Sequence, residues 1–330
     1  MTSRRVTSSE VAVAAGVSRA TVSYVMNPMS RYAVAESTRQ KVLDAAARLG
    51  YSPSISARAL RGKRDLVLAI VPDWPIGHAT SRFFSAIAEE VQARGLTFLI
   101  RYARSDTDAH ELIWRSLSPA AVLSFVEIHP DKIARAREEG ISITMGVFDR
   151  AHDAPNHVEL PEEATGRVQA EHLFATGCRR LGIALPADPR LTSFVEPRRQ
   201  GVREWCERRG LDAPVERVVS MTPDGARRAV EDFVAEGVDG VCCYNDELAV
   251  AILSGARQLG VAVPSQLAVI GVDDDPVAAL VEPALTSIRL DDPAKAARIA
   301  EAIVAGINGD DLADLTEETS TITVIQRQST

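Results

Sequence analysis

The chain has 330 residues, 46% of them hydrophobic, and a formal net charge of -8. This length exceeds that of one ordinary domain, and the hydrophobic fraction is typical of a folded protein with substantial cores. The sequence contains no run of about 18 apolar residues, and no apolar stretch follows the basic start at Arg4 and Arg5. A membrane span and a signal peptide are therefore not expected, and we predict a cytoplasmic protein.

Charge is distributed unevenly along the chain. Residues 1–64 contain eleven Lys and Arg residues and three acidic residues, a net charge of +8, whereas residues 65–330 carry -16. A basic module ahead of an acidic body is typical of a nucleic-acid-binding segment attached to a different kind of domain. A solvated basic tail would be the alternative, but this segment also has the patterning of helices.

The cysteines give no sign of a metal site or a disulfide framework. Cys178, Cys206, Cys242 and Cys243 show no C-x-x-C spacing and have no nearby pair of His residues. We expect them to be buried, reduced thiols, and we expect neither a metal nor a cofactor.

Three helices are predicted at the amino terminus. The segment from Thr7 to Glu10 has the pattern of a capping box, so a first helix starts there and ends at Gly16. Ser18 is predicted to cap a second helix that runs from Arg19 to about residue 27. Two short helices joined by a tight turn form a helix-turn-helix. A second capping box at residues 37–40 is predicted to open a third helix that ends at Gly50.

The second helix has an outward face suited to base recognition. Arg19, Ala20 and Tyr24 lie on this face and are expected to reach base edges in the major groove. Arg19 suits the edge of guanine, whereas Ala20 offers only a methyl contact. Short polar side chains are expected to position the protein on phosphates, with helix capping as the alternative role. These are Thr7, Ser18, Thr21, Ser23, Asn27 and Thr38.

From residue 65 onward, apolar strands alternate with amphipathic helices. Strands are predicted at 66–71, 96–101, 121–125, 141–147, 181–185, 215–220, 240–244 and 267–271, with closing strands near 286–289 and 321–325. Helices are predicted at 83–93, 131–139, 163–175, 198–209, 224–236 and 247–259. This alternation indicates parallel sheets covered on both faces, here as two doubly wound lobes. Ligands of such sheets bind beyond the carboxyl ends of the strands, which places the site between the lobes.

Several short motifs occur, at characteristic distances from one another, along essentially the whole chain. They include Ala15-Gly16-Val17-Ser18, Thr21-Val22-Ser23, Leu49-Gly50-Tyr51, Tyr244-Asn245-Asp246-Glu247, Val269-Ile270-Gly271-Val272-Asp273-Asp274 and Pro283-Ala284-Leu285-Thr286. Together they resemble the lactose-repressor (purine- and galactose-repressor) family of bacterial transcription regulators. The sequence departs from the family pattern in a loop at 28–34 that is about two residues longer, in Ser54, in residues 77–84 and in Val202.

The resemblance implies a small all-α helix-turn-helix domain followed by an α/β periplasmic-binding-protein-like domain. The DNA-binding domain is expected at 1–53, a hinge helix and linker at 54–64, and the effector-binding and dimerisation domain at 65–330. Lobe one is expected at about 65–161 plus 291–320, and lobe two at about 162–290 plus 321–330. The hinge, with Ala57 and Leu60, is expected to pair with that of a partner, and Leu60 is expected to enter the minor groove. An ordinary core contact is the alternative for Leu60.

The resemblance also implies which residues hold the effector. Arg198, Asn245 and Asp273 occupy the positions of effector contacts, and the further candidates are Asp73, Trp74, Phe84 and Asp149. An Arg fork, a carboxamide and carboxylates suit the paired hydroxyls of a sugar, and Trp74 offers an apolar face for its ring. A role in caps or turns is the alternative for the Asp and Asn residues.

The predicted function is that of a repressor that binds palindromic operator DNA as a homodimer and is switched by a small molecule, a sugar or sugar derivative. Activation is one alternative, because the sequence does not contain the operator's position relative to a promoter, and both induction and corepression stay open. A solute-binding protein without a DNA role is a second alternative, which the basic module opposes. An enzyme is not expected, since no P-loop, G-x-G-x-x-G, G-x-S-x-G or H-E-x-x-H motif is present. One member of the family becomes a tetramer through an additional carboxy-terminal heptad helix. We expect no such helix after the last predicted strand, and so nothing larger than a dimer.

Overall fold

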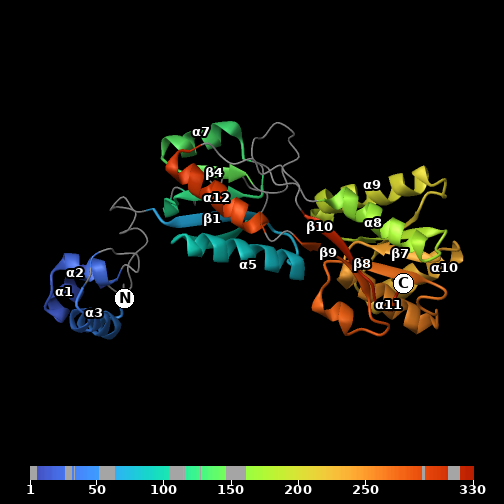
Figure 1. Ribbon diagram of the computed structural model, residues 1–330, viewed down its shortest axis with the longest axis horizontal. Coiled ribbons are helices and arrows are strands. Elements are labelled where there is room, and N and C mark those ends of the chain that lie inside the picture. The colour runs from blue at the N-terminus through green and yellow to red at the C-terminus, as the bar shows by residue number, and fades with distance from the viewer. Residues whose placement is uncertain are drawn as a thin grey trace.

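The computed structural model arranges the chain as three bodies in a row: a helical amino-terminal domain, lobe one and lobe two (Figure 1). It describes residues 6–26, 32, 34–51, 64–103, 114, 116–126, 128–145, 161–291, 294–310 and 320–330. The candidate contacts Asn27, Ala57, Leu60 and Asp149 lie outside these residues. Helix-turn-helix followed by two α/β lobes is the fold class that the sequence predicts.

The amino-terminal domain contains α1 (Ser8–Ala15), α2 (Arg19–Val25) and α3 (Glu36–Leu49), packed around the core residues Val11, Val22 and Val42. The first capping box is confirmed: the backbone N–H of Glu10 donates to the Thr7 hydroxyl, and the N–H of Thr7 donates to Glu10 Oε2 over 2.7 Å. Gly16 then ends α1 in a left-handed conformation with φ of 68°. Ser18 caps α2, as predicted.

The predicted start of the third helix is wrong. Helix α3 begins at Glu36, one position before the expected cap at Ser37, and its N-cap residue Ala35 makes no side-chain hydrogen bond. Ser37 and Thr38 therefore lie inside the first turn. A carboxylate in the first turn interacts favourably with the helix dipole, so Glu36 supports a start two residues earlier than a hydroxyl cap at Ser37 would give.

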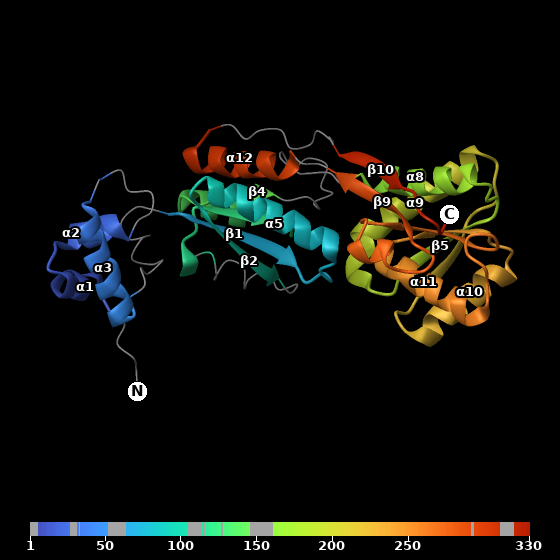
Figure 2. The ribbon, with the colours of Figure 1, turned by 60° about the horizontal axis from the view of Figure 1, so that its bottom comes forward.

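Lobe one is built on a parallel sheet with strand order β2-β1-β3-β4. Its elements are β1 (Leu66–Pro72), α5 (His78–Ala93), β2 (Thr97–Ala103), β3 (Ala121–Ser124), α7 (Pro130–Glu138), β4 (Ser142–Met145) and α12 (Lys295–Asn308). Helices α5 and α12 lie side by side over one face (Figure 2), where Ile87 of α5 and Ile299 and Ile303 of α12 share one core. Helix α7 covers the other face with Ala136.

Lobe two is built on a sheet with strand order β10-β9-β8-β7-β5-β6, in which only β10 is antiparallel to its neighbour. Its elements are α8 (Glu162–Ala175), β5 (Leu181–Pro186), η1 (Pro189–Leu191), α9 (Thr192–Arg208), β6 (Val215–Val219), α10 (Pro223–Ala235), β7 (Gly240–Cys243), α11 (Asp246–Leu259), β8 (Ala268–Val272), η2 (Pro276–Ala279), β9 (Thr286–Asp291) and β10 (Thr321–Ile325). Helices α10 and α11 cover one face with Phe233 and Ile252, and α8 and α9 cover the other with Leu173 and Trp205.

All ten predicted strands are present with ends within two residues of those expected, but the helices differ more. Helix α12 is an addition to the predicted elements. Helix α9 begins at Thr192 instead of Arg198 and continues through Pro197, which removes a single hydrogen bond close to the start of the helix. This longer α9 carries Phe194 and Arg198 on one continuous element.

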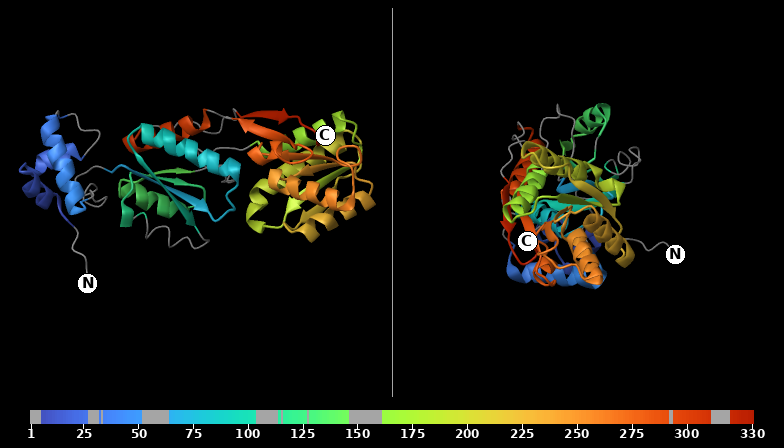
Figure 3. Two further views of the ribbon diagram at one scale, coloured as in Figure 1. Left: turned by 90° about the horizontal axis from the view of Figure 1, so that it is seen from below. Right: turned by 90° about the vertical axis from the view of Figure 1, so that its right-hand side faces the viewer.

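The chain crosses between the lobes more than once (Figure 3). After β9 in lobe two it returns to α12 in lobe one, and after α12 it enters β10 in lobe two. In each parallel sheet the strand order reverses once, between β1 and β3 in lobe one and between β5 and β7 in lobe two. Side chains that follow the carboxyl ends of strands at such reversals are well placed to hold a ligand.

Candidate functional site

The second helix of the amino-terminal domain turns one face to solvent. Arg19 and Ala20 are exposed at its start, whereas Val22 and Val25 are buried in the domain core. Tyr24 is half-buried on the same helix. The predicted reading residues therefore lie on the surface of a rigid element whose opposite face is anchored by packing.

Two of the short polar residues of this domain, Thr7 and Ser18, cap helices. The Ser18 hydroxyl accepts the N–H of Thr21 over 3.0 Å and lies 2.9 Å from the Thr21 hydroxyl, and Thr7 forms the capping box of α1. Thr7 and Ser18 are exposed, and Thr21, Ser23 and Thr38 are half-buried. Capping uses only part of the hydrogen-bonding capacity of a hydroxyl, so an exposed cap is still able to donate to a phosphate.

Tyr32 adds an aromatic ring to this domain that sequence reasoning missed. Its ring stacks on that of Tyr24 with 4.5 Å between the centroids, and 67% of Tyr32 is exposed. Tyr32 belongs to the loop that is longer than the family pattern. The extra length of this loop was the sequence feature that marked the region as unusual. Loop length alone does not predict that the Tyr32 ring stacks on Tyr24.

Two side chains that follow β1 in lobe one contact lobe two. Arg190 in η1 donates to the backbone oxygen of Asp73 and lies 3.6 Å from its carboxylate. The ring of Trp74 meets that of Phe194 edge-on, with 5.1 Å between the centroids. Asp73 and Trp74 are both effector candidates by sequence. In this structure both take part in contacts that join the facing ends of the two lobes.

Arg198 lies at the centre of a buried polar cluster in lobe two. Its Nε donates to Glu162 Oε2 over 2.7 Å, its Nη2 donates to the same oxygen, and its Nη1 donates to the backbone oxygen of Tyr244. The guanidinium also lies 4.8 Å from the centroid of the Tyr244 ring. Only 8% of each side chain, Arg198 and Glu162, is exposed. Sequence reasoning missed Glu162, because 36 residues separate it from its partner.

Two glycines allow helices α8 and α9 to approach closely enough for this contact. A Cβ on Gly166 would lie 1.9 Å from the backbone oxygen of Arg198, and a Cβ on Gly201 would lie 2.0 Å from that of Glu163. Each glycine thus faces the backbone of the other helix. This reciprocal contact brings the start of α8, with Glu162, against the middle of α9.

The turn after β8 holds Asp273 in an unusual conformation. Asp273 has φ of 102° and Asp274 has φ of 46°, both positive, which non-glycine residues adopt only when surrounding contacts impose it. The backbone N–H groups of residues 273–275 donate to the oxygen of Ile288 over 2.8 Å, to Ser287 Oγ over 3.0 Å and to Asp246 Oδ2 over 2.7 Å. Arg327 Nη2 further binds Asp274 over 2.6 Å.

Burial sets the electrostatics of this turn. It raises the pKa of Asp273 to about 7, opposed by the positive charge of Arg198, which lowers it. Burial likewise raises the pKa of Asp246 to about 7, opposed by the hydrogen bonds from Ser287 and Asp275. The site is therefore acidic, with carboxylates that ionise near neutral pH.

Two of the predicted effector residues have structural roles. Asn245 caps α11, because its Oδ1 accepts the N–H of Leu248 over 3.0 Å, which leaves its amide N–H groups for other partners. Phe84 is only 4% exposed and packs against Phe125 in the core of lobe one, so it offers almost no surface to a ligand.

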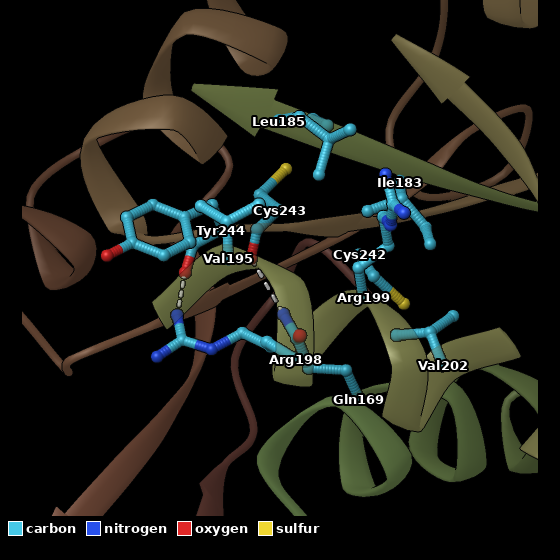
Figure 4. A pocket seen from close by; sticks show the side chains of 11 residues that line it. Gln169, Ile183, Leu185, Val195, Arg198, Arg199, Val202, Cys242, Cys243 and Tyr244 are labelled. Atoms are coloured by element: carbon cyan, nitrogen blue, oxygen red, sulfur yellow. Dashed lines mark hydrogen bonds between the residues drawn. The ribbon is translucent and has the colours of Figure 1, made fainter. Parts of the chain in front are cut away.

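A small pocket lies at the carboxyl ends of β5 and β7, against α8 and α9 (Figure 4). Ile183, Leu185 and Val202 are among the apolar side chains that line it, and Gln169 donates to the Cys243 backbone oxygen at its edge. Its volume of about 10 Å³ holds no more than one water molecule. The pocket is therefore too small for a sugar.

The cysteines are buried and free, as predicted. Burial raises the pKa of Cys206 to about 11 and holds that of Cys242 well above its ordinary value, so these thiols stay protonated and unreactive. Within the described residues, no three His, Cys, Asp or Glu side chains gather in a way that could hold a metal ion. In the same part of the chain, no helix has both the length and the apolar character needed to cross a membrane.

The fold and the site define a class of protein: a DNA-binding transcription regulator with a helix-turn-helix domain joined to a two-lobed, ligand-binding type of domain. Two family models match the chain accordingly. The one for bacterial regulatory proteins of the lacI family matches residues 7–54, and the one for the periplasmic binding protein-like domain matches residues 170–330. The chain belongs to the lacI family of bacterial regulatory proteins.

Relatives match over nearly the full chain. The transcriptional regulator GntR of Pseudomonas aeruginosa is 31% identical over 95% of this chain and 92% of its own length. The regulator CelR of Thermobifida fusca is 31% identical over 93% of both chains. The lactose operon repressor of Escherichia coli is 28% identical over 87% of this chain and 80% of its own length.

Solved structures agree in fold. The structure of the lac repressor dimer bound to operator and the anti-inducer ONPF has a TM-score of 0.75 at 21% identity, covering 99% of each chain. The complex of the regulator CelR with cellobiose has a TM-score of 0.66 at 25% identity, covering 99% of this chain and all of the other.

Proposed function

We propose that this protein is a repressor that binds palindromic operator DNA as a homodimer and is switched by a sugar held between its lobes. One observation carries the ligand-binding part. Arg198, buried in α9, and Asp273, half-buried in the turn after β8, interact electrostatically at the strand ends of lobe two, and Asp73 and Trp74 of lobe one lie at the facing strand ends. An Arg fork with a carboxylate suits paired hydroxyls.

The DNA-binding part rests on helix α2 and the family. Arg19, Ala20 and Tyr24 are proposed to read base edges, and Thr7, Ser18, Thr21, Ser23, Asn27 and Thr38 to contact phosphates. Ala57 and Leu60 are proposed to act in a hinge at 54–64, with Leu60 entering the minor groove. The lac repressor, a relative of the same fold, has been solved as a dimer bound to operator. We place the site of action in the cytoplasm, where bacterial operator DNA lies.

The switch is proposed to be an exchange between two arrangements of the lobes. Residues 65–330 form the effector domain, and a rotation of lobe one changes the spacing of the two hinges in the dimer. A hinge this short is helical only while its partner is close, so a small rotation releases it from DNA. Coupling is reciprocal: an effector that lowers operator affinity tenfold is bound tenfold less tightly by the DNA complex.

The test combines operator binding with ligand titration. Purified full-length protein is titrated onto DNA from upstream of its own gene, with and without sugars, and fluorescence anisotropy reports binding. Asp273→Asn is expected to abolish the ligand response and to leave operator affinity within a few fold. Asp212→Asn, whose side chain is 87% exposed in the same lobe, is the matched control. A ligand response that survives in Asp273→Asn would place the effector elsewhere.

Arg198→Ala is a less informative variant than Asp273→Asn. It would leave the buried Glu162 carboxylate without its partner, and an uncompensated buried charge typically costs about 3–5 kcal/mol. Loss of function would then reflect unfolding. The assembly is tested separately by light scattering, where a stable tetramer at micromolar concentration would contradict the proposed dimer.

A further inference from the structure

We infer that Glu162 makes the proposed effector site selective for uncharged, hydroxyl-bearing ligands and excludes anionic ones such as sugar acids and sugar phosphates. This inference rests on the proposed function, because it concerns the chemistry of the same site. It follows from the way in which Arg198 is already engaged by the protein.

The positive charge of Arg198 is neutralised by a carboxylate of the protein itself. Its Nε and Nη2 both donate to Glu162 Oε2, and the two side chains are equally buried, with 8% of each exposed. A guanidinium recognises a carboxylate or phosphate by two parallel hydrogen bonds and a free positive charge. Here Glu162 accepts the two hydrogen bonds from Nε and Nη2 of Arg198. An anionic ligand would therefore meet an ion pair with no net charge.

The remaining charge near Arg198 is negative. Asp273 acts electrostatically on Arg198 from the turn after β8, and Asp246 lies behind it. In the contact between η1 of lobe two and the end of β1 in lobe one, Arg190 forms ion pairs with Asp188, over 2.5 Å, and with Asp73. Among the described residues of the site, each guanidinium is thus matched by at least one carboxylate, and an added anion would meet like charge in a partly dehydrated space.

Hydroxyl groups are still accommodated. A guanidinium has five N–H groups, and the contacts with Glu162 and with the Tyr244 oxygen use three. Two remain to donate to a ligand oxygen, and Asp273 accepts hydrogen bonds from ligand hydroxyls. Neutral donors and acceptors satisfy both groups without bringing in a charge.

Glu162→Gln is the decisive variant. It preserves the size of the side chain and an acceptor for Arg198, but it restores an uncompensated positive charge. The matched control is Glu163→Gln, the next residue along the same helix, whose half-exposed side chain lies 3.5 Å from Arg167. Calorimetry on the full-length proteins compares glucose with glucuronate and glucose 6-phosphate, galactose with galacturonate, and cellobiose. Sulfate is titrated as a simple anion, with thermal unfolding as the readout.

The wild-type protein and Glu163→Gln are expected to bind a neutral sugar at least tenfold more tightly than its acid, and to show only the same general rise in melting temperature with sulfate. Glu162→Gln is expected to gain sulfate and acid binding of at least tenfold. The inference is overturned if the wild type binds an acid or phosphate as tightly as the neutral sugar, a comparison that requires no variant. It is also overturned if a folded Glu162→Gln gains no anion binding over Glu163→Gln.

These outcomes separate the inference from the proposed function. An operator complex that responds to a sugar acid keeps the proposed switch and overturns the selectivity. Conversely, Glu162→Gln could gain anion binding while no ligand changes the operator affinity. That result would support the neutralisation of Arg198 by Glu162 and would contradict the proposed switch.

Discussion

The hydroxyl of Ser287 donates a hydrogen bond of 2.6 Å to the carboxylate of Asp246, which is only 1% exposed. The other oxygen of Asp246 accepts the backbone N–H of Asp275 over 2.7 Å. One buried carboxylate therefore ties strand β9 to the turn that carries Asp273. Asp246 is a positioning residue, since it fixes the backbone from which a proposed effector contact projects.

Asp246→Asn is expected to change how stability depends on pH. Burial raises the pKa of Asp246 from 3.8 to about 7. Between these values the folded chain holds a proton that the unfolded chain has lost, so the free energy of unfolding falls as pH rises from about 4 to 7, and it levels off above 7. One such group contributes a slope of up to about 1.4 kcal/mol per pH unit. Asn does not titrate, so the variant loses this slope.

The measurement is urea unfolding of wild type and variant at several pH values. Asp273 contributes a slope of the same sign, because burial raises its pKa to about 7 as well, and it persists in both proteins. Asp212→Asn, an exposed position, is expected to match the wild type. Equal slopes for wild type and Asp246→Asn would contradict the prediction.

Gly166→Ala is expected to separate helices α8 and α9. The added Cβ would lie 1.9 Å from the backbone oxygen of Arg198, so the helices have to move apart. Overpacking of this kind typically costs about 1–3 kcal/mol, and here it also displaces Glu162 from Arg198. Gly77→Ala is the control, because nothing lies within 4 Å of a Cβ at that position. Chemical unfolding checks the difference, and a Gly166→Ala protein as stable as the control would refute the close approach.

Arg190→Ala is expected to loosen the contact between the lobes. Arg190 bridges from η1 to Asp73, and a ligand held by both lobes favours the arrangement in which they touch. Removing the bridge should weaken effector binding a few fold and raise the radius of gyration in small-angle scattering, with little change in unfolding. Arg208→Ala removes an ion pair with Glu204 within α9 and serves as the control. Identical scattering and affinity for both variants would argue against the bridge.

Tyr32→Ala is expected to weaken operator binding through Tyr24. The stacked pair, with centroids 4.5 Å apart, restricts the ring of Tyr24 on α2, and such aromatic pairs are worth about 0.5–1.5 kcal/mol. Operator affinity should fall by about two- to tenfold by that estimate. Tyr32→Phe keeps the ring and should bind like the wild type. If Ala and Phe at position 32 gave equal affinities in a gel-shift titration, the stack would have no part in DNA binding.

Local patterns predict much of the fold. The capping box at Thr7, the turn at Gly16 and the alternation of apolar strands with helices all depend on neighbours within a few residues, and all are present. Prediction fails at the start of α3, where two local signals compete, and it also omits α12, although the sequence of α12 is amphipathic. At the start of α3 a carboxylate at Glu36 prevails over a hydroxyl cap at Ser37, and α12 escapes prediction although Ile299 and Ile303 complete the core of lobe one.

The sequence by itself determined the modules, the family and the positions of Arg198 and Asp273, because family motifs and periodicity are properties of short segments. Only the tertiary structure decided what surrounds those residues. Glu162 reaches Arg198 because Gly166 and Gly201 let two helices approach, and Asp246 fixes the Asp273 turn through Ser287 on another strand. Such contacts join residues tens of positions apart, and whether a carboxylate neutralises a given guanidinium depends on the packing of backbones that no local pattern encodes.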